Sequence, residues 1–233
     1  MSSLQKKKTS KEAGFTLVEI AIVLVIIGLL LGGILKGQEM ITQAKIKNVI
    51  NDFNGITAAV TSYQDRYRAL PGDDQNATTR WTTQSPVSGN GNGIVAGLYN
   101  VNDQSGTAGA PGGTAESNLF WQHLRIAGFV PGPTQGLGSG TPPPNATGGI
   151  LGVETGVSGT NGMGFTSLII CTSNLPDKIA IAVDTQMDDG SPAGGQVRGQ
   201  LQTSPNPATV GTTAGATPYA ETGTNSYLLC KGI

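Results

Sequence analysis

Glu19 is the one ionisable residue in an apolar stretch that runs from Phe15 to Leu35. A carboxylate in a membrane helix costs roughly 2.5–3.5 kcal/mol at the helix centre and less near the interface, so such a residue is a candidate for function. A cation placed beside Glu19 would offset the desolvation of both charges, and neither charge is well satisfied alone. The chemistry predicted for Glu19 is therefore the formation of an ion pair in apolar surroundings.

A cluster of carboxylates, formed by Asp184, Asp188 and Asp189, comes just before Gly190. Oxygen ligands in a turn with a glycine suit Ca²⁺, which makes these three residues candidate calcium ligands. Their spacing is not that of an EF-hand loop, and a solvated acidic turn is the other interpretation of the cluster. Calcium is the only cofactor that the sequence suggests.

The chain contains two cysteines, Cys171 and Cys230. In an exported protein an even number of cysteines suggests a disulfide, whereas in a cytosolic protein two unlinked buried thiols are the simpler interpretation. The N-terminal segment described below favours export, and we therefore predict the bridge. On the chain-entropy model it would stabilise the fold by about 4 kcal/mol.

The chain contains one histidine, His123. No cysteine and no second histidine lies near it in the sequence to complete a metal site. No Ser–His–Asp arrangement can be defended either. We interpret His123 as a structural residue, and we predict no catalytic residue and no enzymatic activity.

The segment from Phe15 to Leu35 is long enough to cross a membrane. About 20 helical residues at 1.5 Å each cover the ~30 Å hydrocarbon core of a bilayer. A secretory signal peptide would have a shorter apolar core with a cleavage site after it. A plain anchor gives no reason for Glu19, and the lysines that precede the segment argue against a buried core helix. We predict a transmembrane helix over residues 15–35.

Charge is divided unevenly along the chain. Residues 1–14 contain four lysines and Glu12, so their net charge is +3, and the rest of the chain must carry −4 to reach the total of −1. The basic end is expected to stay in the cytoplasm, which places the residues after Lys36 outside. The acidic remainder provides no electrostatic footprint for nucleic acid.

An amphipathic pattern continues the helix over residues 36–70. Apolar residues recur at alternating steps of three and four, which is typical of a narrow apolar seam on a helix. The seam would also fit a coiled coil, but we favour a helix packed on the chain's own sheet, because it runs on directly from the apolar span. Pro71 and Gly72 predict the end of the helix at Ala69. The residues of the seam are Ile46, Val49, Phe53, Ile56, Val60, Tyr63, Tyr67 and Leu70.

Residues 71–233 are predicted to form a globular head with long loops rich in glycine and proline. A short helix is predicted over residues 117–129, with Ser117 as its cap and Gly128 at its end. Residues 130–162 are predicted to form a long loop. Strands are predicted in an antiparallel meander at residues 165–172, 179–185, 195–201 and 227–230. The fold class is therefore α+β, with a long N-terminal helix on a small antiparallel sheet.

The run Gly14-Phe15-Thr16-Leu17-Val18-Glu19 resembles the processing site of type IV prepilins and of the pseudopilins of type II secretion. The pattern of that family is a short basic leader that ends in glycine, then a phenylalanine, then a glutamate four residues later, then an apolar helix. All four parts are present in this order. The resemblance covers about the first 60 residues and implies a pilin-like fold.

The resemblance also implies roles for three residues. Residues 1–14 would form a leader that a prepilin peptidase removes by cutting between Gly14 and Phe15. The same enzyme would methylate the new amine of Phe15, and Glu19 would pair with the Phe15 amine of a neighbouring subunit. The implied partners are further copies of this chain in a helical filament, the peptidase and methylase, and an inner-membrane assembly platform.

The function implied by the resemblance is that of a structural subunit, major or minor, of a type IV pilus or a related filament. A type II secretion pseudopilin is one alternative, and Lys36 stands where many pilus-forming subunits have a proline. A membrane-anchored adhesin or binding module that never polymerises is an alternative of another class. The expected location is the bacterial inner membrane with the head in the periplasm, followed by a surface pilus or a periplasmic pseudopilus.

Overall fold

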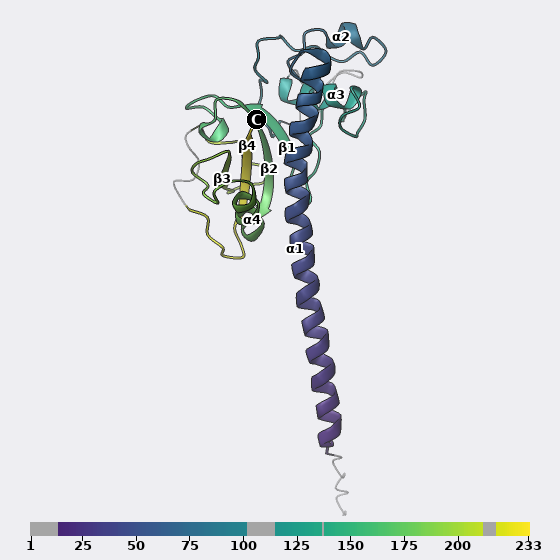
Figure 1. The fold of residues 1–233 in the computed structure, drawn as a ribbon, viewed down its shortest axis with the longest axis vertical. Coiled ribbons are helices and arrows are strands. Elements are labelled where there is room, and N and C mark those ends of the chain that lie inside the picture. The colour runs from purple at the N-terminus through teal and green to yellow at the C-terminus, as the bar shows by residue number, and fades with distance from the viewer. Residues whose placement is uncertain (1–13, 102–114, 137, 212–217) are drawn as a thin grey trace, which may run out of the picture. The chain divides into compact units, whose positions relative to one another are not determined.

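The computed structural model describes residues 14–101, 115–136, 138–211 and 218–233. Within these residues the elements follow the order α1, α2, α3, β1, β2, α4, β3 and β4, with a 3₁₀ helix at Gly162–Gly164 before β2 (Figure 1). The chain forms two compact units that divide between Gln43 and Ala44. Of the predicted leader over residues 1–14, only Gly14 lies within the described part of the chain.

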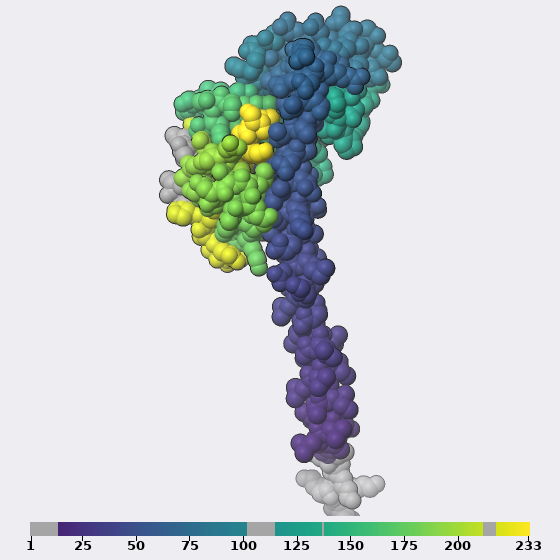
Figure 2. Space-filling view, in the orientation of Figure 1, coloured from purple at the N-terminus to yellow at the C-terminus, as the bar shows by residue number. Residues whose placement is uncertain are grey.

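Helix α1 spans Leu17–Tyr67 and has 51 residues. Of the described residues, it forms the one helix that is long and apolar enough to cross a membrane, by length and composition. Its large apolar side chains up to Ile41 are exposed, Leu17 to 90% and Leu29 to 73%. The atoms of this part of α1 are the purple ones in Figure 2. The helix continues through Gly28 and Gly32, although each glycine weakens a helix by up to about 1 kcal/mol relative to alanine.

The C-terminal end of α1 lies at Tyr67, two residues before the predicted end at Ala69. Arg68 turns the chain with a left-handed φ of 54°, and its N–H donates to the carbonyl of Gln64 at 2.8 Å. Gly72 then follows with a φ of 89°, where a Cβ would lie 2.5 Å from the carbonyl oxygen of Glu116. This position requires glycine, because both the backbone angle and the close approach exclude a side chain.

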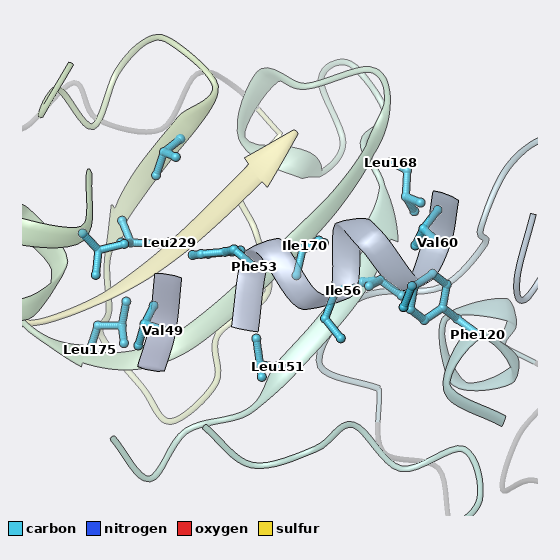
Figure 3. Close-up of a cluster of buried hydrophobic side chains, with 14 of the residues drawn as sticks. Val49, Phe53, Ile56, Val60, Phe120, Leu151, Leu168, Ile170, Leu175 and Leu229 are labelled. Carbon is cyan, nitrogen blue, oxygen red and sulfur yellow. The ribbon is translucent and has the colours of Figure 1, made fainter. Parts of the chain in front are cut away.

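The main hydrophobic core lies between the second part of α1 and the sheet (Figure 3). The seam residues of α1 from Ile46 to Tyr63 are buried in it, and Tyr67 and Leu70 are partly buried against it. Val49 and Phe53 are fully buried, beside apolar residues of the strands such as Ile170 and Leu229. The long helix and the small antiparallel sheet of the predicted α+β fold are therefore confirmed.

The sheet has four antiparallel strands in the order β1-β2-β4-β3. The strands are β1 (Leu151–Thr155), β2 (Leu168–Pro176), β3 (Val197–Leu201) and β4 (Ser226–Gly232). The antiparallel pairing agrees with the prediction, but the meander order is wrong. The last strand, β4, lies between β2 and β3, because the segment after β2 is a helix that carries the chain across to the edge of the sheet.

The predicted strand over residues 179–185 is wrong, because these residues form helix α4 (Asp177–Met187). Ile179, Ala180 and Val183 are buried and lie on one side of this helix. A short apolar run of this kind fits a buried strand and a helix face equally well from its periodicity alone. Pro176 occupies the N-cap position of α4, where the absence of a backbone N–H has no cost.

Strand β1 was missed, because residues 130–162 were predicted to be a loop. Its five residues are flanked by glycines and prolines, and no hairpin turn joins it to a predicted strand. The strand is set by its pairing with β2, in which Leu151 lies opposite Thr172 and Thr155 opposite Leu168. Such non-local pairing leaves no signal in a local window of sequence.

Helix α3 spans Glu116–Ile126, close to the predicted range of 117–129. Its N-cap is Ala115 and not Ser117, which lies inside the helix and donates its backbone N–H to the carbonyl of Ala96 at 3.0 Å. The predicted end is confirmed, since Gly128 follows with a left-handed φ of 79°. Helix α2 is a single turn at Ala77–Arg80.

Candidate functional site

Thr16 and Glu19 form the beginning of helix α1. The backbone N–H and the hydroxyl of Thr16 both donate to Oε2 of Glu19 at 2.8 Å, and the N–H of Glu19 donates back to the Thr16 hydroxyl at 3.3 Å. This is the reciprocal arrangement of a capping box, which satisfies N–H groups that have no partner inside the helix. Glu19 therefore has a local structural role in addition to the predicted ion pair.

The second carboxylate oxygen of Glu19, Oε1, accepts no hydrogen bond from any residue that the structure describes. The group lies on an exposed helix, and no lysine or arginine of the described part of the chain forms an ion pair with it. Glu19 can thus keep its cap through one oxygen and receive a cation at the other. Thr16 was not singled out from the sequence, although the Thr-x-x-Glu spacing of a capping box was present.

Gly14 and Phe15 precede the helix and are exposed. The Phe15 side chain is 82% exposed, and a Cβ built on Gly14 would meet no atom within 4 Å. The peptide bond between them is accordingly accessible to an enzyme in the described structure. The lysines of the predicted leader lie outside the described residues.

The N-terminal segment also matches a known family model. The match covers residues 9–35, and the model is described as the prokaryotic N-terminal methylation motif. These residues carry the signature of type IV pilins and pseudopilins. No curated protein matches the chain. The motif includes Gly14, Phe15 and Glu19, and it supports membrane anchoring and a structural subunit that is processed and assembled.

Cys171 and Cys230 form the predicted disulfide. They lie directly opposite each other on the neighbouring strands β2 and β4. Both are fully buried in a second small core, beside Tyr99, Met163 and Leu228. The bridge therefore joins the middle of the sheet and encloses α4 and β3 in its loop.

The side chains of Asp184, Asp188 and Asp189 lie together at the end of α4, with one carboxylate oxygen of each within 4.8 Å of the others. Each of the three carboxylates already accepts a hydrogen bond from another residue of the chain. Asp184 accepts from the Tyr219 hydroxyl at 2.5 Å, Asp188 from the N–H of Val197 at 2.9 Å, and Asp189 from the N–H of Ser191 at 2.8 Å. These bonds organise the turn from α4 to β3, and calcium binding at the cluster stays a prediction.

The surroundings of Asp184 change its acidity. Burial is the largest cause and the neighbouring carboxylates add to it, so that the pKa of Asp184 is raised from 3.8 to about 6. The hydrogen bonds from Tyr219 and Gly190 oppose this rise. Burial beside two other carboxylates disfavours the charged form of Asp184, so Asp184 keeps its proton to a higher pH than an exposed aspartate does.

His123 is fully buried. Its Nδ1 accepts from the N–H of Gly72 at 3.0 Å, so its Nε2, which is 2.8 Å from the carbonyl oxygen of Val87, must be the donor there. Burial lowers the pKa of the imidazole. These bonds join α3 to the chain after α1 and agree with the structural role predicted for His123.

Three further carboxylates, at Asp73, Asp74 and Glu116, hold the segment that follows α1. Asp73 accepts from three consecutive backbone N–H groups, those of Gly91, Asn92 and Gly93, at 2.6–3.0 Å. Asp74 accepts from the Tyr63 hydroxyl at 2.7 Å and pairs with Arg80. Sequence reasoning missed this network, because the partners are separated by up to 26 residues and no local pattern joins them.

Proposed function

We propose that this chain is the precursor of a filament subunit of the type IV pilin class. A prepilin peptidase cuts the bond between Gly14 and Phe15 and methylates the new amine, and the mature protein assembles through α1. The methylation motif over residues 9–35 and the exposure of the Gly14–Phe15 bond support the processing step. The exposed apolar surface of α1 before Ile41 supports assembly, because it is covered by no described part of the chain.

The proposal rests on the surroundings and hydrogen bonds of the Glu19 carboxylate. Its carboxylate stands in an apolar stretch, holds the helix start through Oε2, and has Oε1 without a hydrogen-bond partner among the described residues. The cationic amine of a cleaved Phe15 from a neighbouring subunit satisfies that oxygen. Each charge then offsets the desolvation of the other, which neither achieves alone in apolar surroundings.

Within this class we assign the chain to a type IV pilus, as a major or minor subunit. Its partners are further copies of the chain, the peptidase and methylase, and an inner-membrane assembly platform. The head lies in the periplasm before assembly. A type II secretion pseudopilin is the second candidate, because Lys36 occupies the position at which many pilus-forming subunits have a proline.

The first experiment is mass spectrometry of the mature N-terminus after expression with a prepilin peptidase. We expect a chain that begins with N-methylated Phe15. A chain that keeps Met1, or one cut after residue 35, would contradict the proposal. Recovery of the mature chain in sheared surface filaments supports a pilus, whereas its retention in the periplasm with loss of protein secretion on gene deletion supports a pseudopilus.

The second experiment replaces Glu19. Glu19→Gln keeps the size of the side chain and its ability to accept from Thr16, but it removes the charge. We expect normal cleavage at Phe15 and at least a tenfold loss of the subunit from filaments, which is the loss of about 1.4 kcal/mol or more per pairing.

Glu39→Gln is the matched control for Glu19→Gln. Glu39 lies on the same helix and pairs with Lys36 at 3.8 Å, with both side chains exposed. The control is expected to assemble normally, because an exposed pair contributes little. Wild-type filament yield from Glu19→Gln would remove the assembly role of this residue.

A further inference from the structure

A polar pocket of about 360 Å³ lies at the end of the sheet where β2 ends and β4 begins. None of the described residues that line it is charged. Its volume falls in the ~300–1,000 Å³ range of small-molecule sites. The pocket lies within the unit of residues 44–233 and is independent of the N-terminal helix start.

Two asparagines in strained backbone conformations shape this pocket. Asn174 has a φ of 59° and Asn206 a φ of 46°. Both angles lie in the left-handed region, which residues other than glycine, asparagine and aspartate seldom adopt. Asn174 sits where the register of β2 against β4 shifts, between Thr172 and Leu175. Irregularities of this kind re-aim a side chain out of the regular strand and are frequent beside binding sites.

Each of three amide side chains around the pocket is fixed by a hydrogen bond on one side only. Gln202 Oε1 accepts from the N–H of Asn174 at 2.8 Å, and Asn206 Oδ1 accepts from the Ser173 hydroxyl at 2.5 Å. The Asn174 Nδ2 donates to the carbonyl of Thr147 at 3.2 Å. The bonds to backbone groups assign which end of the Gln202 and Asn174 amides is oxygen and which is nitrogen.

The other side of each amide is left for a ligand. Gln202 Nε2 and Asn206 Nδ2 are donors, Asn174 Oδ1 is an acceptor, and none of the three has a hydrogen-bond partner among the described residues. The hydroxyls of Thr203, Ser204 and Ser226 border the same pocket, and no hydrogen bond to their side chains occurs within the described part of the chain. Fixed donors and acceptors thus stand beside hydroxyls that can rotate.

We propose that this pocket binds a neutral saccharide. A sugar presents several adjacent hydroxyls, each a donor and an acceptor, which matches two amide donors, one amide acceptor and rotatable hydroxyls. A lining without charge provides no ion pair for a phosphate, a carboxylate or a metal ion. Thr203 and Ser204 are exposed, so the terminal sugar of a longer glycan can enter from solvent.

The test is saturation-transfer NMR on the full chain in a detergent without sugar groups. The probes are the methyl glycosides of glucose, galactose, mannose, N-acetylglucosamine and N-acetylgalactosamine, with glucuronic acid and N-acetylneuraminic acid as charged counterparts. We expect transfer to at least one neutral sugar at millimolar concentration and weaker transfer to the charged ones. Absence of transfer to every neutral probe, or preferred binding of a charged one, overturns the proposal.

Two variants locate the binding. Ser204→Trp fills the pocket from an exposed position, and we expect at least a tenfold loss of affinity for the bound sugar. Thr203→Ala combined with Ser204→Ala removes two hydroxyls but no hydrogen bond of the described structure, and we expect a loss of about three- to tenfold. Thr83→Trp, at an exposed threonine outside the pocket, is the matched control and is expected to bind as the wild type does. Unchanged binding by Ser204→Trp overturns the proposal.

Discussion

Thr16 and Glu19 show how one side chain can serve the helix and remain available to a partner. The cap occupies Oε2 of Glu19 and the backbone and hydroxyl of Thr16, and it leaves Oε1 without a partner in the described structure. A carboxylate near the N-terminus of a helix is also stabilised by the helix dipole. In the proposed pairing, the orientation of Glu19 would thus be set in advance, which would reduce the entropy lost when the pair forms.

Thr16→Val removes the hydroxyl and should loosen the first turn of α1. Loss of a threonine N-cap costs about 0.5–2 kcal/mol, which corresponds to roughly 2- to 30-fold faster amide hydrogen exchange at Glu19 and Ile20, whose N–H groups donate to Thr16. The measurement is exchange on the full chain in detergent micelles. Thr16→Ser keeps a hydroxyl and serves as the control, with protection close to that of the wild type. Equal protection in all three proteins would show that the cap contributes nothing.

Asp184 should make the stability of the chain sensitive to pH. Because the pKa of Asp184 is raised from 3.8 to about 6, the folded state binds this proton more tightly than the unfolded chain does. The contribution of Asp184 to stability is therefore lowest above pH 6 and increases as the pH falls from about 6 to about 4. Asp188, Asp189 and the Tyr219 hydroxyl are the ionisable groups that face it.

Asp184→Asn removes this titration and keeps an oxygen for the Tyr219 hydroxyl. Relative to the variant, we expect the wild type to gain about 1–1.5 kcal/mol of stability between pH 7.5 and pH 5, because the full effect of the shift is reached only near pH 4. Trp81 and Trp121 both lie in the unit of residues 44–233, so tryptophan fluorescence during denaturant unfolding reports on it. Parallel pH profiles for the two proteins would contradict the assignment.

At the scale of elements, sequence periodicity predicted α1 well and the sheet less well. The seam from Ile46 to Tyr63 repeats over several turns, and a long pattern of that kind has few alternative interpretations. Helix α4 and strand β1 each rest on short stretches of apolar residues. Their type is decided by what they pack against, and the position of β4 between β2 and β3 depends on non-local pairing.

The sites follow the same division between local and non-local information. Gly14, Phe15 and Glu19 stand in one short local motif within the matched residues 9–35, and their roles stay predictions, whereas the disulfide could be predicted from the number of cysteines. The pocket beside Asn174 and Asn206 could not be predicted, because segments about 30 residues apart along the chain form it. Loops that are stabilised by buried carboxylates leave no local pattern in the sequence either.

The disulfide supports the sheet at its centre. Replacing both Cys171 and Cys230 with alanine should lower the free energy of unfolding by about 4 kcal/mol, because the unfolded chain regains the entropy that the closed loop removes. Denaturant unfolding of the full chain in detergent, followed by tryptophan fluorescence, measures the change. Reduced wild-type protein is the control and should lose a similar amount. A loss below about 1 kcal/mol would show that packing around β2 and β4 alone holds the sheet.

At the scale of the whole molecule, burial and exposure are divided between the two units. In the described chain, the first buried apolar residue is Ile46, and all the others come after it. These residues form the two cores of the unit of residues 44–233. The large exposed apolar residues lie mostly between Phe15 and Ile41. One unit therefore has the means to fold by itself, and the other presents its apolar surface to a membrane or to other subunits.

Removal of residues 1–43 should leave a soluble, folded protein. None of the buried core residues is lost, and the remaining part of α1 is held by its seam against the sheet rather than by its own helix propensity. We expect a monomer in buffer without detergent, with the Cys171–Cys230 bridge formed and a melting temperature within about 3 °C of the full chain, equivalent to a change of roughly 1 kcal/mol. Light scattering, thiol titration and calorimetry measure these three properties.

The variant Phe53→Ala in the same truncated chain should lose about 3–5 kcal/mol of unfolding free energy, because it opens a cavity at a fully buried position of the seam. If the truncated wild type aggregates or lacks cooperative unfolding, then residues 44–233 depend on the N-terminal segment for their fold, and the division of roles between the two units is wrong.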